Sequence, residues 1–121
     1  MESIELVKAI VRSLDTHKAQ DIRVLQVGEV TPLADYFIVA AATSTTGVRA
    51  LTDYVDTDLG KLDVPSPRLE GYQTLQWTLL DYGTVVVHIF LDSTREFYGL
   101  ERLWQDARPL DPAMFLEDEE S

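Results

Sequence analysis

Two apolar stretches, at residues 36–42 and 85–91, place the strongest limit on how this chain can fold. Both are far shorter than the ~20 apolar residues that a helix needs to cross a bilayer. Residues 35–41 are apolar at almost every position, so an extended chain here is apolar on both faces. That pattern is typical of a central strand in a sheet that is covered on both sides. The sequence therefore predicts a sheet built around this strand.

Two other segments have the periodicity of α-helices. Ser3 is placed to cap a first helix that ends near His17. Thr43 or Ser44 is placed to cap a second helix, whose apolar stripe reaches Leu62. The apolar positions of the first helix are Ile4, Val7, Ile10, Val11 and Leu14. Each helix therefore has one apolar face that can be buried.

Strands are expected at residues 22–27, 35–41, 74–80 and 84–91. Residues 81–83 join the last two strands as a short hairpin, with Gly83 at a position of positive φ. A third helix should begin at Ser93, which starts an S-x-x-E capping box, and should run to about Gln105. The expected order α-β-β-α-β-β-α describes an α/β (α+β) fold with a mixed β-sheet flanked by helices.

The chain of 121 residues fits one compact domain, which we assign to residues 1–105. Residues 106–121 contain two prolines and six acids against one Arg, without a helical or strand period. We therefore expect them to form an acidic, partly disordered and flexible tail. Met114, Phe115 and Leu116 are the only cluster of large apolar side chains in this segment.

The chain is acidic, with a net charge of −11 from 21 acidic and 10 basic residues. Phosphate repels such a chain, so we expect no direct binding to nucleic acid and favour a basic protein partner. The alternative is that the negative surface only keeps the protein soluble. The absence of cysteine excludes disulfides, thiolate zinc sites and cysteine nucleophiles. The N-terminal residues resemble neither a signal nor a transit peptide, which favours a cytoplasmic protein without membrane attachment.

No set of side chains predicts catalysis. A hydrolytic triad needs a histidine beside a nucleophile and an acid, and neither His17 nor His88 has such neighbours in sequence. Asp56 and Asp58 form a D-x-D pair, but residues two apart on a helix do not share a face. Residues 43–47 could bind an anion at a helix start, although capping is the simpler interpretation. We therefore expect no catalytic, cofactor-binding or metal-binding residue and no enzyme activity.

Several blocks of the sequence resemble, in order and spacing, those of the Iojap (ribosomal silencing factor) family. The most specific is the run D-Y-G…V-V-V-H-I-F…R-x-x-Y-x-L-E-R-L-W, which starts at Asp81. The blocks fall within residues 1–105 at positions 20–22, 34–40, 70–71, 77, 80–83, 86–90 and 95–104. The sequence departs from the family at Thr84, where Asp is common, and at Thr46 and Gly47, where a basic or polar pair is common.

The resemblance implies a fold related to nucleotidyl transferases without their activity, and a homodimer. It also implies docking on the large ribosomal subunit through a basic ribosomal protein of the L-fourteen type. Such docking blocks subunit association and represses translation under nutrient limitation. Two alternatives stay open: a large-subunit assembly factor, and a nucleotidyl transferase-like enzyme, for which Asp35 and Asp81 are the only candidate pair.

A protein that docks on a basic partner needs an aromatic anchor with acidic residues around it. The expected partner-binding residues are Trp77, Asp81, Tyr82, Tyr98 and Glu101. Trp77 lies in the middle of the third predicted strand, and we expect one face of its ring to be packed on the sheet. Tyr82 lies at the hairpin turn, where we expect it to be almost purely interfacial. The alternative for Trp77 and Tyr98 is simple packing in the core.

Overall fold

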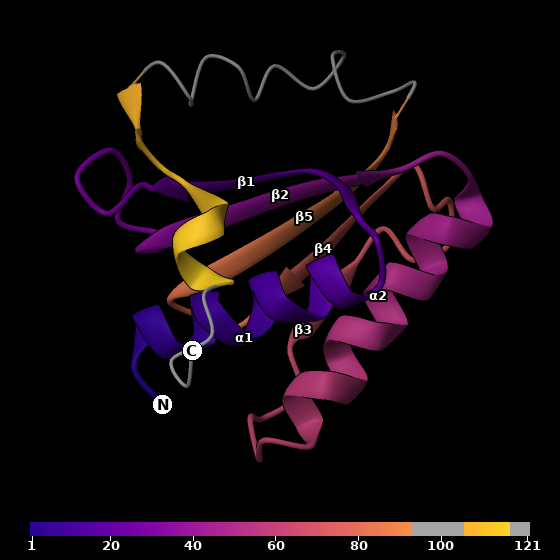
Figure 1. Cartoon of the computed structure of the whole chain (residues 1–121), viewed down its shortest axis with the longest axis horizontal. Helices are drawn as coiled ribbons and strands as arrows, with labels where there is room; N and C mark the ends of the chain where they lie inside the picture. The colour runs from indigo at the N-terminus through magenta and orange to yellow at the C-terminus, as the bar shows by residue number, and fades with distance from the viewer. Residues whose placement is uncertain (93–105, 117–121) are drawn as a thin grey trace.

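The computed structural model describes residues 1–92 and 106–116 (Figure 1). Within these ranges a six-stranded mixed sheet, in the order β3-β4-β5-β2-β1-β6, packs against two α-helices. The elements are α1 (Ser3–Thr16), β1 (Gln20–Gln26), β2 (Tyr36–Ala42), α2 (Thr45–Gly60), β3 (Arg68–Glu70), β4 (Trp77–Asp81), β5 (Val85–Leu91), β6 (Arg108–Leu110) and the 3-10 helix η2 (Pro112–Phe115). The predicted α+β class and mixed sheet are confirmed. The third predicted helix, at residues 93–105, lies outside the described residues.

The two apolar stretches form the central strands of the sheet. β2 and β5 pair in parallel, from Tyr36 opposite Val85 to Ala42 opposite Leu91. The other strand pairs are antiparallel. A parallel pair needs a long crossover connection, and here the chain passes through α2, β3 and β4 between the two strands.

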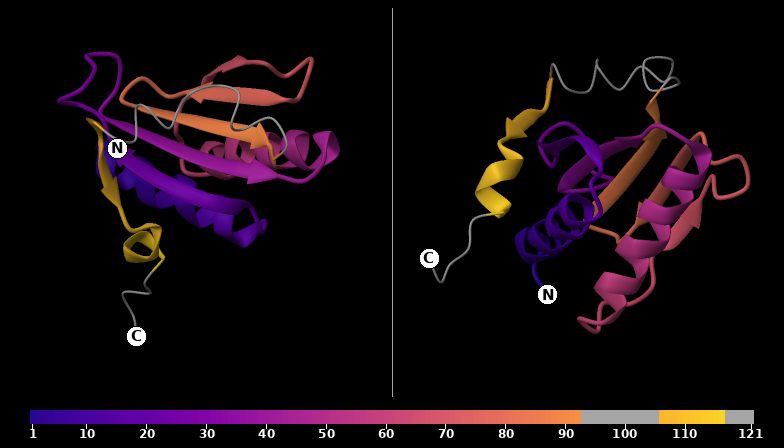
Figure 2. Two further views of the ribbon diagram at one scale, coloured as in Figure 1. Left: turned by 90° about the horizontal axis from the view of Figure 1, so that it is seen from above. Right: turned by 45° about the vertical axis from the view of Figure 1, so that its right-hand side comes forward.

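Both described helices lie on one face of the sheet, which we call the helix face (Figures 1 and 2). Side chains alternate between the two faces of a strand, so Val85, Val87 and Ile89 of β5 all point to the helix face. They form one core with residues from α1 and α2. Two residues that were predicted to lie on the apolar faces of the helices do not fit. Ile4 is 41% exposed, and Leu62 lies beyond the end of α2 and is 51% exposed.

The helix starts show one correct and one incorrect cap prediction. Ser44 caps α2, because its hydroxyl oxygen accepts the Gly47 backbone N–H at 3.0 Å. Ser3 does not cap α1, because it is already inside the first turn and Glu2 holds the cap position. There the Glu2 backbone N–H donates to the Glu5 carboxylate at 3.3 Å, which is half of a capping box. Capping is thus the local role of the residues around Ser44.

Residues 106–116 differ from the expected tail. β6 pairs antiparallel with β1, and η2 follows it against α1, as Figure 2 shows. Phe115 is only 4% exposed and belongs to the core on the helix face, while Arg12 Nε donates to the Phe115 carbonyl at 3.2 Å. Burial of one large ring provides the free energy that the rest of this short, polar segment lacks. Residues 117–121 lie outside the described residues.

The segment before β4 was predicted least well. β3 was not expected, and β4 begins at Trp77 rather than at Thr74. Gly71 and Leu75 both have positive φ, at 79° and 59°, so the chain turns tightly before the strand starts. The Leu75 backbone N–H closes this turn by donating to the Gly71 carbonyl at 3.1 Å. Trp77 is therefore the first residue of its strand rather than a residue in the middle.

Gly71 should be essential for the position of Trp77. A Cβ atom at Gly71 would lie 2.0 Å from the Trp77 carbonyl oxygen, and the positive φ adds a cost of about 1–2 kcal/mol. We expect Gly71→Ala to lower the free energy of unfolding in urea by more than this amount and to change Trp77 fluorescence. Gly60→Ala is the matched control, because no atom lies within 4 Å of its added Cβ. Equal stabilities for the two variants would contradict the role of Gly71.

Candidate functional site

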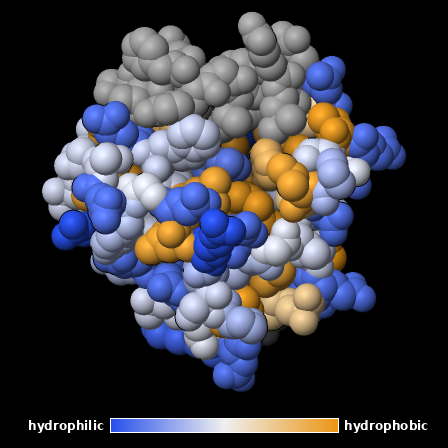
Figure 3. Space-filling view, turned by 180° about the vertical axis from the view of Figure 1, so that it is seen from behind, coloured by the Kyte–Doolittle hydropathy of each residue, from blue (hydrophilic) through white to orange (hydrophobic). Residues whose placement is uncertain are grey.

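The face of the sheet opposite to α1 and α2 carries a cluster of aromatic rings. Phe37 of β2, Trp77 of β4, and His88 and Phe90 of β5 lie on it, and we call it the aromatic face. The Trp77 ring stacks on Phe90 with ring centroids 5.0 Å apart, and Phe37 meets His88 edge-on at 4.8 Å. Seen from behind, apolar residues gather near the middle of the surface (Figure 3). Packing of this kind holds large rings in fixed positions.

A hydrogen bond between side chains fixes the orientation of Trp77. The indole Nε1–H of Trp77 donates to Nδ1 of His88 at 3.1 Å. Indole nitrogen can only donate, so Nδ1 must carry a lone pair and the neutral imidazole must carry its proton on Nε2. His88 thus acts as a buried acceptor that orients the indole ring.

His88 itself is almost completely enclosed, at 4% exposure. Burial lowers the pKa of His88 from its ordinary value to about 4, because a charged imidazolium loses its hydration there. Its Nε2 atom is also buried and has no hydrogen-bond partner within residues 1–92 and 106–116. The ring is therefore neutral at neutral pH, which preserves the bond from Trp77.

Trp77 and Asp81 lie on the same side of β4, four residues apart. Trp77 is half-buried, which agrees with the expectation that its ring packs partly on the sheet. Asp81 is also half-buried, and its Oδ1 accepts the Gly83 backbone N–H at 2.8 Å. Strand geometry separates the two backbones by about 13 Å. An aromatic ring and a carboxylate therefore border the same strip of sheet.

Tyr82 differs from its predicted exposure at the turn. It is half-buried and packs toward the core on the helix face. Its hydroxyl is buried, without a hydrogen-bond partner in the part of the chain that the structure describes. Burial, followed by the nearby Asp56 carboxylate, raises the pKa of the Tyr82 phenol above its ordinary value. The structure therefore does not bring Tyr82 together with Trp77.

Two of the predicted partner-binding residues, Tyr98 and Glu101, lie outside the described residues. Conversely, Phe37, His88 and Phe90 were not predicted to lie on the same face of the sheet as Trp77. The alternation of β5 was a usable signal for two of them, because residues 88 and 90 must share a face. The pairing of β5 with both β2 and β4, which brings these rings together, could not be predicted from that alternation alone.

The carboxylates nominated for a catalytic alternative are apart. Asp35 precedes β2 and Asp81 ends β4, with β5 between these two strands. The spacing of neighbouring strands places their backbones about 10 Å from each other. Asp35 instead accepts a hydrogen bond from the Ser3 hydroxyl at 3.2 Å. Across the described residues, no group of three or more His, Asp or Glu side chains could hold a metal ion.

The D-x-D pair in α2 faces two directions, as its helical spacing predicts. Asp58 accepts the Ser13 hydroxyl at 2.7 Å and lies 3.3 Å from Nε2 of His17, so it connects α2 to α1. Asp56 lies near Tyr82. His17 also stacks on Tyr54, with ring centroids 3.7 Å apart. These side chains join the two helices and do not surround a common site.

Across residues 1–92 and 106–116, none of the helices has the length and apolar character needed to cross a membrane. The fold and the site together define an α+β domain with a cluster of aromatic rings on the face of the sheet opposite to α1 and α2. A family profile described as "Ribosomal silencing factor during starvation" matches residues 1–121. The chain belongs to the ribosomal silencing factor family.

Known relatives agree with this assignment. A ribosomal silencing factor from Halalkalibacterium halodurans is 34% identical over 107 residues, which cover 88% of this chain and 92% of that protein. A crystal structure of a Chromobacterium violaceum protein has a TM-score of 0.82 and 35% identity, covering 87% of this chain and 88% of that one. A mouse protein named "Mitochondrial assembly of ribosomal large subunit protein 1" is 35% identical over 98 residues, which cover 78% of this chain but only 43% of the mouse protein. None of the three names or titles denotes an enzyme.

The buried neutral state of His88 should make stability depend on pH. The unfolded chain binds the proton near pH 6.5 and the folded chain only near pH 4, so the unfolded state gains protons first as the pH falls. The stability that depends on a neutral His88 is fully present above about pH 6.5. As the pH falls toward 4, the free energy of unfolding decreases by roughly 3 kcal/mol at most. We expect His88→Phe to lose less stability than the unmodified protein over this range in urea unfolding. His17→Gln removes the other histidine and should lose as much stability between pH 6.5 and 4 as the unmodified protein does. The same change of unfolding free energy with pH in all three proteins would refute this role of His88.

Proposed function

We propose that this protein silences ribosomes by docking on the large subunit through a basic ribosomal protein of the L-fourteen type. The bound protein blocks association with the small subunit and represses translation under nutrient limitation. Membership of the ribosomal silencing factor family supports this proposal, as do the names of its relatives. The finer points, namely the partner, the blocked step and the nutrient signal, follow from the family resemblance.

The single observation that carries the proposal is the fixed, half-buried Trp77. Its indole is held by the hydrogen bond to His88 and by stacking on Phe90, so little side-chain entropy remains to be lost on binding. Tryptophan is enriched among the residues that contribute most to protein interfaces. Asp81, on the same side of β4, supplies negative charge toward a basic partner. We include Tyr98 and Glu101 in the proposed docking surface on the basis of sequence.

Tyr82 has a different place in the proposal. Its side chain packs toward the helix face, so we propose that it supports the β4–β5 turn and contacts the partner only at the edge of the surface. This turn also contains the Asp81 carboxylate, which caps Gly83. A change at Tyr82 should therefore act mainly through the shape of the turn.

We propose that docking requires no catalysis, so that the protein is a binding module rather than an enzyme. The separation of Asp35 from Asp81 by β5 supports this, because a shared metal needs both carboxylates on one ion. We also propose that the protein works in the cytoplasm as a homodimer, as the resemblance implies. The excess of 21 acidic over 10 basic residues supports a protein partner rather than naked RNA.

A second candidate is assembly of the large subunit. The name of the mouse relative, which states a role in assembly of the mitochondrial large subunit, favours it. An assembly factor and a silencing factor could use the same docking surface, so the two functions differ in outcome rather than in contact. Loss of a silencing factor leaves mature large subunits that join small subunits more freely, whereas loss of an assembly factor leaves immature large subunits.

The direct test is co-sedimentation of the full-length protein with isolated large subunits, followed by a subunit-joining assay. We expect Trp77→Ala to weaken binding by about 30-fold to 1,000-fold, as truncation of a central aromatic anchor costs ~2–4 kcal/mol. Subunit joining should then recover in the presence of the variant. Tyr54→Ala is the matched control, because Tyr54 is a partly exposed aromatic residue on α2, away from the aromatic face.

Tyr82→Phe is a second control, since it removes a buried hydroxyl without a described partner and should leave binding unchanged. Normal binding by Trp77→Ala would remove the aromatic face from the docking surface. Binding to purified ribosomal RNA that is tighter than binding to the ribosomal protein, at the same salt concentration, would refute the choice of partner. Binding without any effect on joining would favour the assembly candidate.

A further inference from the structure

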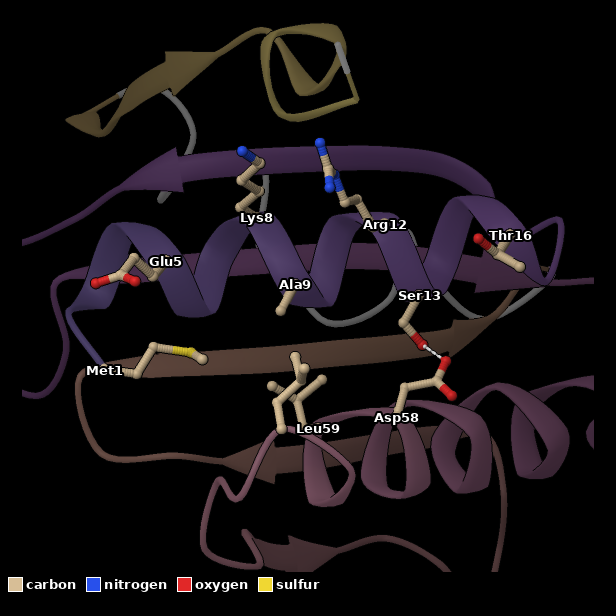
Figure 4. Close-up of a pocket in the computed structure, with 10 residues that line it drawn as sticks. Met1, Glu5, Lys8, Ala9, Arg12, Ser13, Thr16, Asp58 and Leu59 are labelled. Atoms are coloured by element: carbon tan, nitrogen blue, oxygen red, sulfur yellow. Dashed lines mark hydrogen bonds between the residues drawn. The ribbon is translucent and has the colours of Figure 1, made fainter. Parts of the chain in front are cut away.

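The helix side of the molecule has a groove that the proposed docking surface does not use. It runs between α1 and α2, has a volume of about 590 Å³, and is open to solvent (Figure 4). Its floor is apolar, with Ala9 and Leu59 at the bottom and the exposed side chain of Met1 at one end. Figure 4 shows the hydrogen bond between Ser13 and Asp58 at the other end. The groove is thus closed at one end by a bond between the two helices.

Two basic side chains form one rim of this groove. Lys8 and Arg12 are one helical turn apart on α1, and Figure 4 shows both extending on the side of α1 that faces η2. Consecutive turns bring them within about 6 Å of each other along the helix axis. Lys8 and Arg12 are the two basic residues in the lining of the groove, which also contains Glu5 and Asp58. We call Lys8 and Arg12 the basic rim.

The described part of the chain ends beside this rim. Phe115 is buried against α1, and its carbonyl oxygen accepts a hydrogen bond from Arg12 Nε at 3.2 Å. Leu116 is the last described residue, and the sequence continues as Glu117-Asp118-Glu119-Glu120-Ser121. Four extended residues span up to about 14 Å, which exceeds the distance between Lys8 and Arg12 along α1. The acidic run can therefore reach both basic side chains from its point of attachment.

We propose that the acidic run at residues 117–120 is the occupant of the basic rim, with its carboxylates paired with Lys8 and Arg12. Four acids next to two cations are complementary in charge, and the Arg12–Phe115 hydrogen bond holds the start of the run at the rim. The pairing fastens η2 to α1 and thereby supports β6 at the edge of the sheet. This inference does not depend on the proposed function, since it concerns the opposite side of the sheet.

Paramagnetic relaxation enhancement tests the proposal directly. The chain has no cysteine, so Ser121→Cys provides a single site for a spin label on the full-length protein. We expect the label to broaden the amide signals of Lys8, Ala9 and Arg12 more than those of Arg68–Glu70 in β3. Lys8→Gln alone keeps the Arg12–Phe115 bond and should reduce this preference, whereas Lys61→Gln, at an exposed cation after α2, should not.

The melting temperature is an independent measurement. Neutralising residues 117–120 should lower it if the run binds the basic rim and raise it if the run does not. Neutralising the run (Glu117→Gln, Asp118→Asn, Glu119→Gln and Glu120→Gln) should lower the melting temperature by about 2–5 °C at low salt, if the exposed pairs form. The difference should disappear at high salt, which screens exposed charges. Without docking, the same change removes four negative charges from an acidic chain and should raise the melting temperature, because self-repulsion falls.

Three results would overturn the proposal. One is broadening spread evenly over the surface, and another is a rise in the melting temperature of the neutralised variant. The third is broadening that grows with protein concentration, which would assign the run to the groove of a second copy. Broadening at the basic rim that is independent of concentration, together with a lower melting temperature, supports it.

Discussion

The parallel pairing of β2 with β5 is the interaction on which the arrangement of the other described elements depends. Both strands are apolar on both faces, so each can be stable only when material covers the two sides of the sheet. On one side, Val85, Val87 and Ile89 form the core with α1 and α2. On the other side, the residues between them in sequence, Val86, His88 and Phe90, form the floor of the aromatic face. The core under the helices and the aromatic face therefore both depend on β5, whose alternate residues point to opposite sides of the sheet.

The position of Trp77 follows from this arrangement. β4 pairs with β5 in a register that places Trp77 opposite Phe90 and Leu79 opposite His88. The indole is therefore within reach of both rings, and its N–H donates a hydrogen bond to Nδ1 of the neutral imidazole. A buried histidine whose Nε2 has no described partner is costly for stability. Its retention at the centre of the face is explained if the orientation of Trp77 matters more for function than that cost.

The sequence was informative wherever a single local rule decides the structure. Apolar runs located β2 and β5, helical periodicity located α1 and α2, and glycine located the turn at Gly83, whose φ is 92°. It was less informative where distant contacts decide. Phe115 converts a polar, proline-containing segment into β6 and η2, because one buried ring outweighs a weak local preference. The tight turn between Gly71 and Leu75 likewise shifts the start of β4 to Trp77. It requires a positive φ at Leu75, a buried leucine, and residue propensities do not predict this conformation for leucine.

The candidate site was predicted in part for the same reason. Trp77 and Asp81 could be nominated from the acidic composition and the family resemblance, and the structure places them on one side of β4. Tyr82 was assigned to the exposed turn, yet its ring turns toward the helix face, because the residue after a strand end is free to take either side. His88 and Phe90 became part of the site only when the strand order was known. Sequence alternation assigns residues to a face, but strand neighbours determine which residues meet there.

We propose that the aromatic face, and Trp77 in particular, contacts the large ribosomal subunit. Hydroxyl-radical footprinting with mass spectrometry measures the oxidation of each aromatic side chain in the free protein and in the protein bound to isolated large subunits. We expect binding to protect Trp77 strongly from oxidation, while Tyr54 on the helix side keeps the same oxidation rate in both states. Unchanged oxidation of Trp77 together with protection of Tyr54 would contradict this proposal, and would place the contact on the helix side of the sheet.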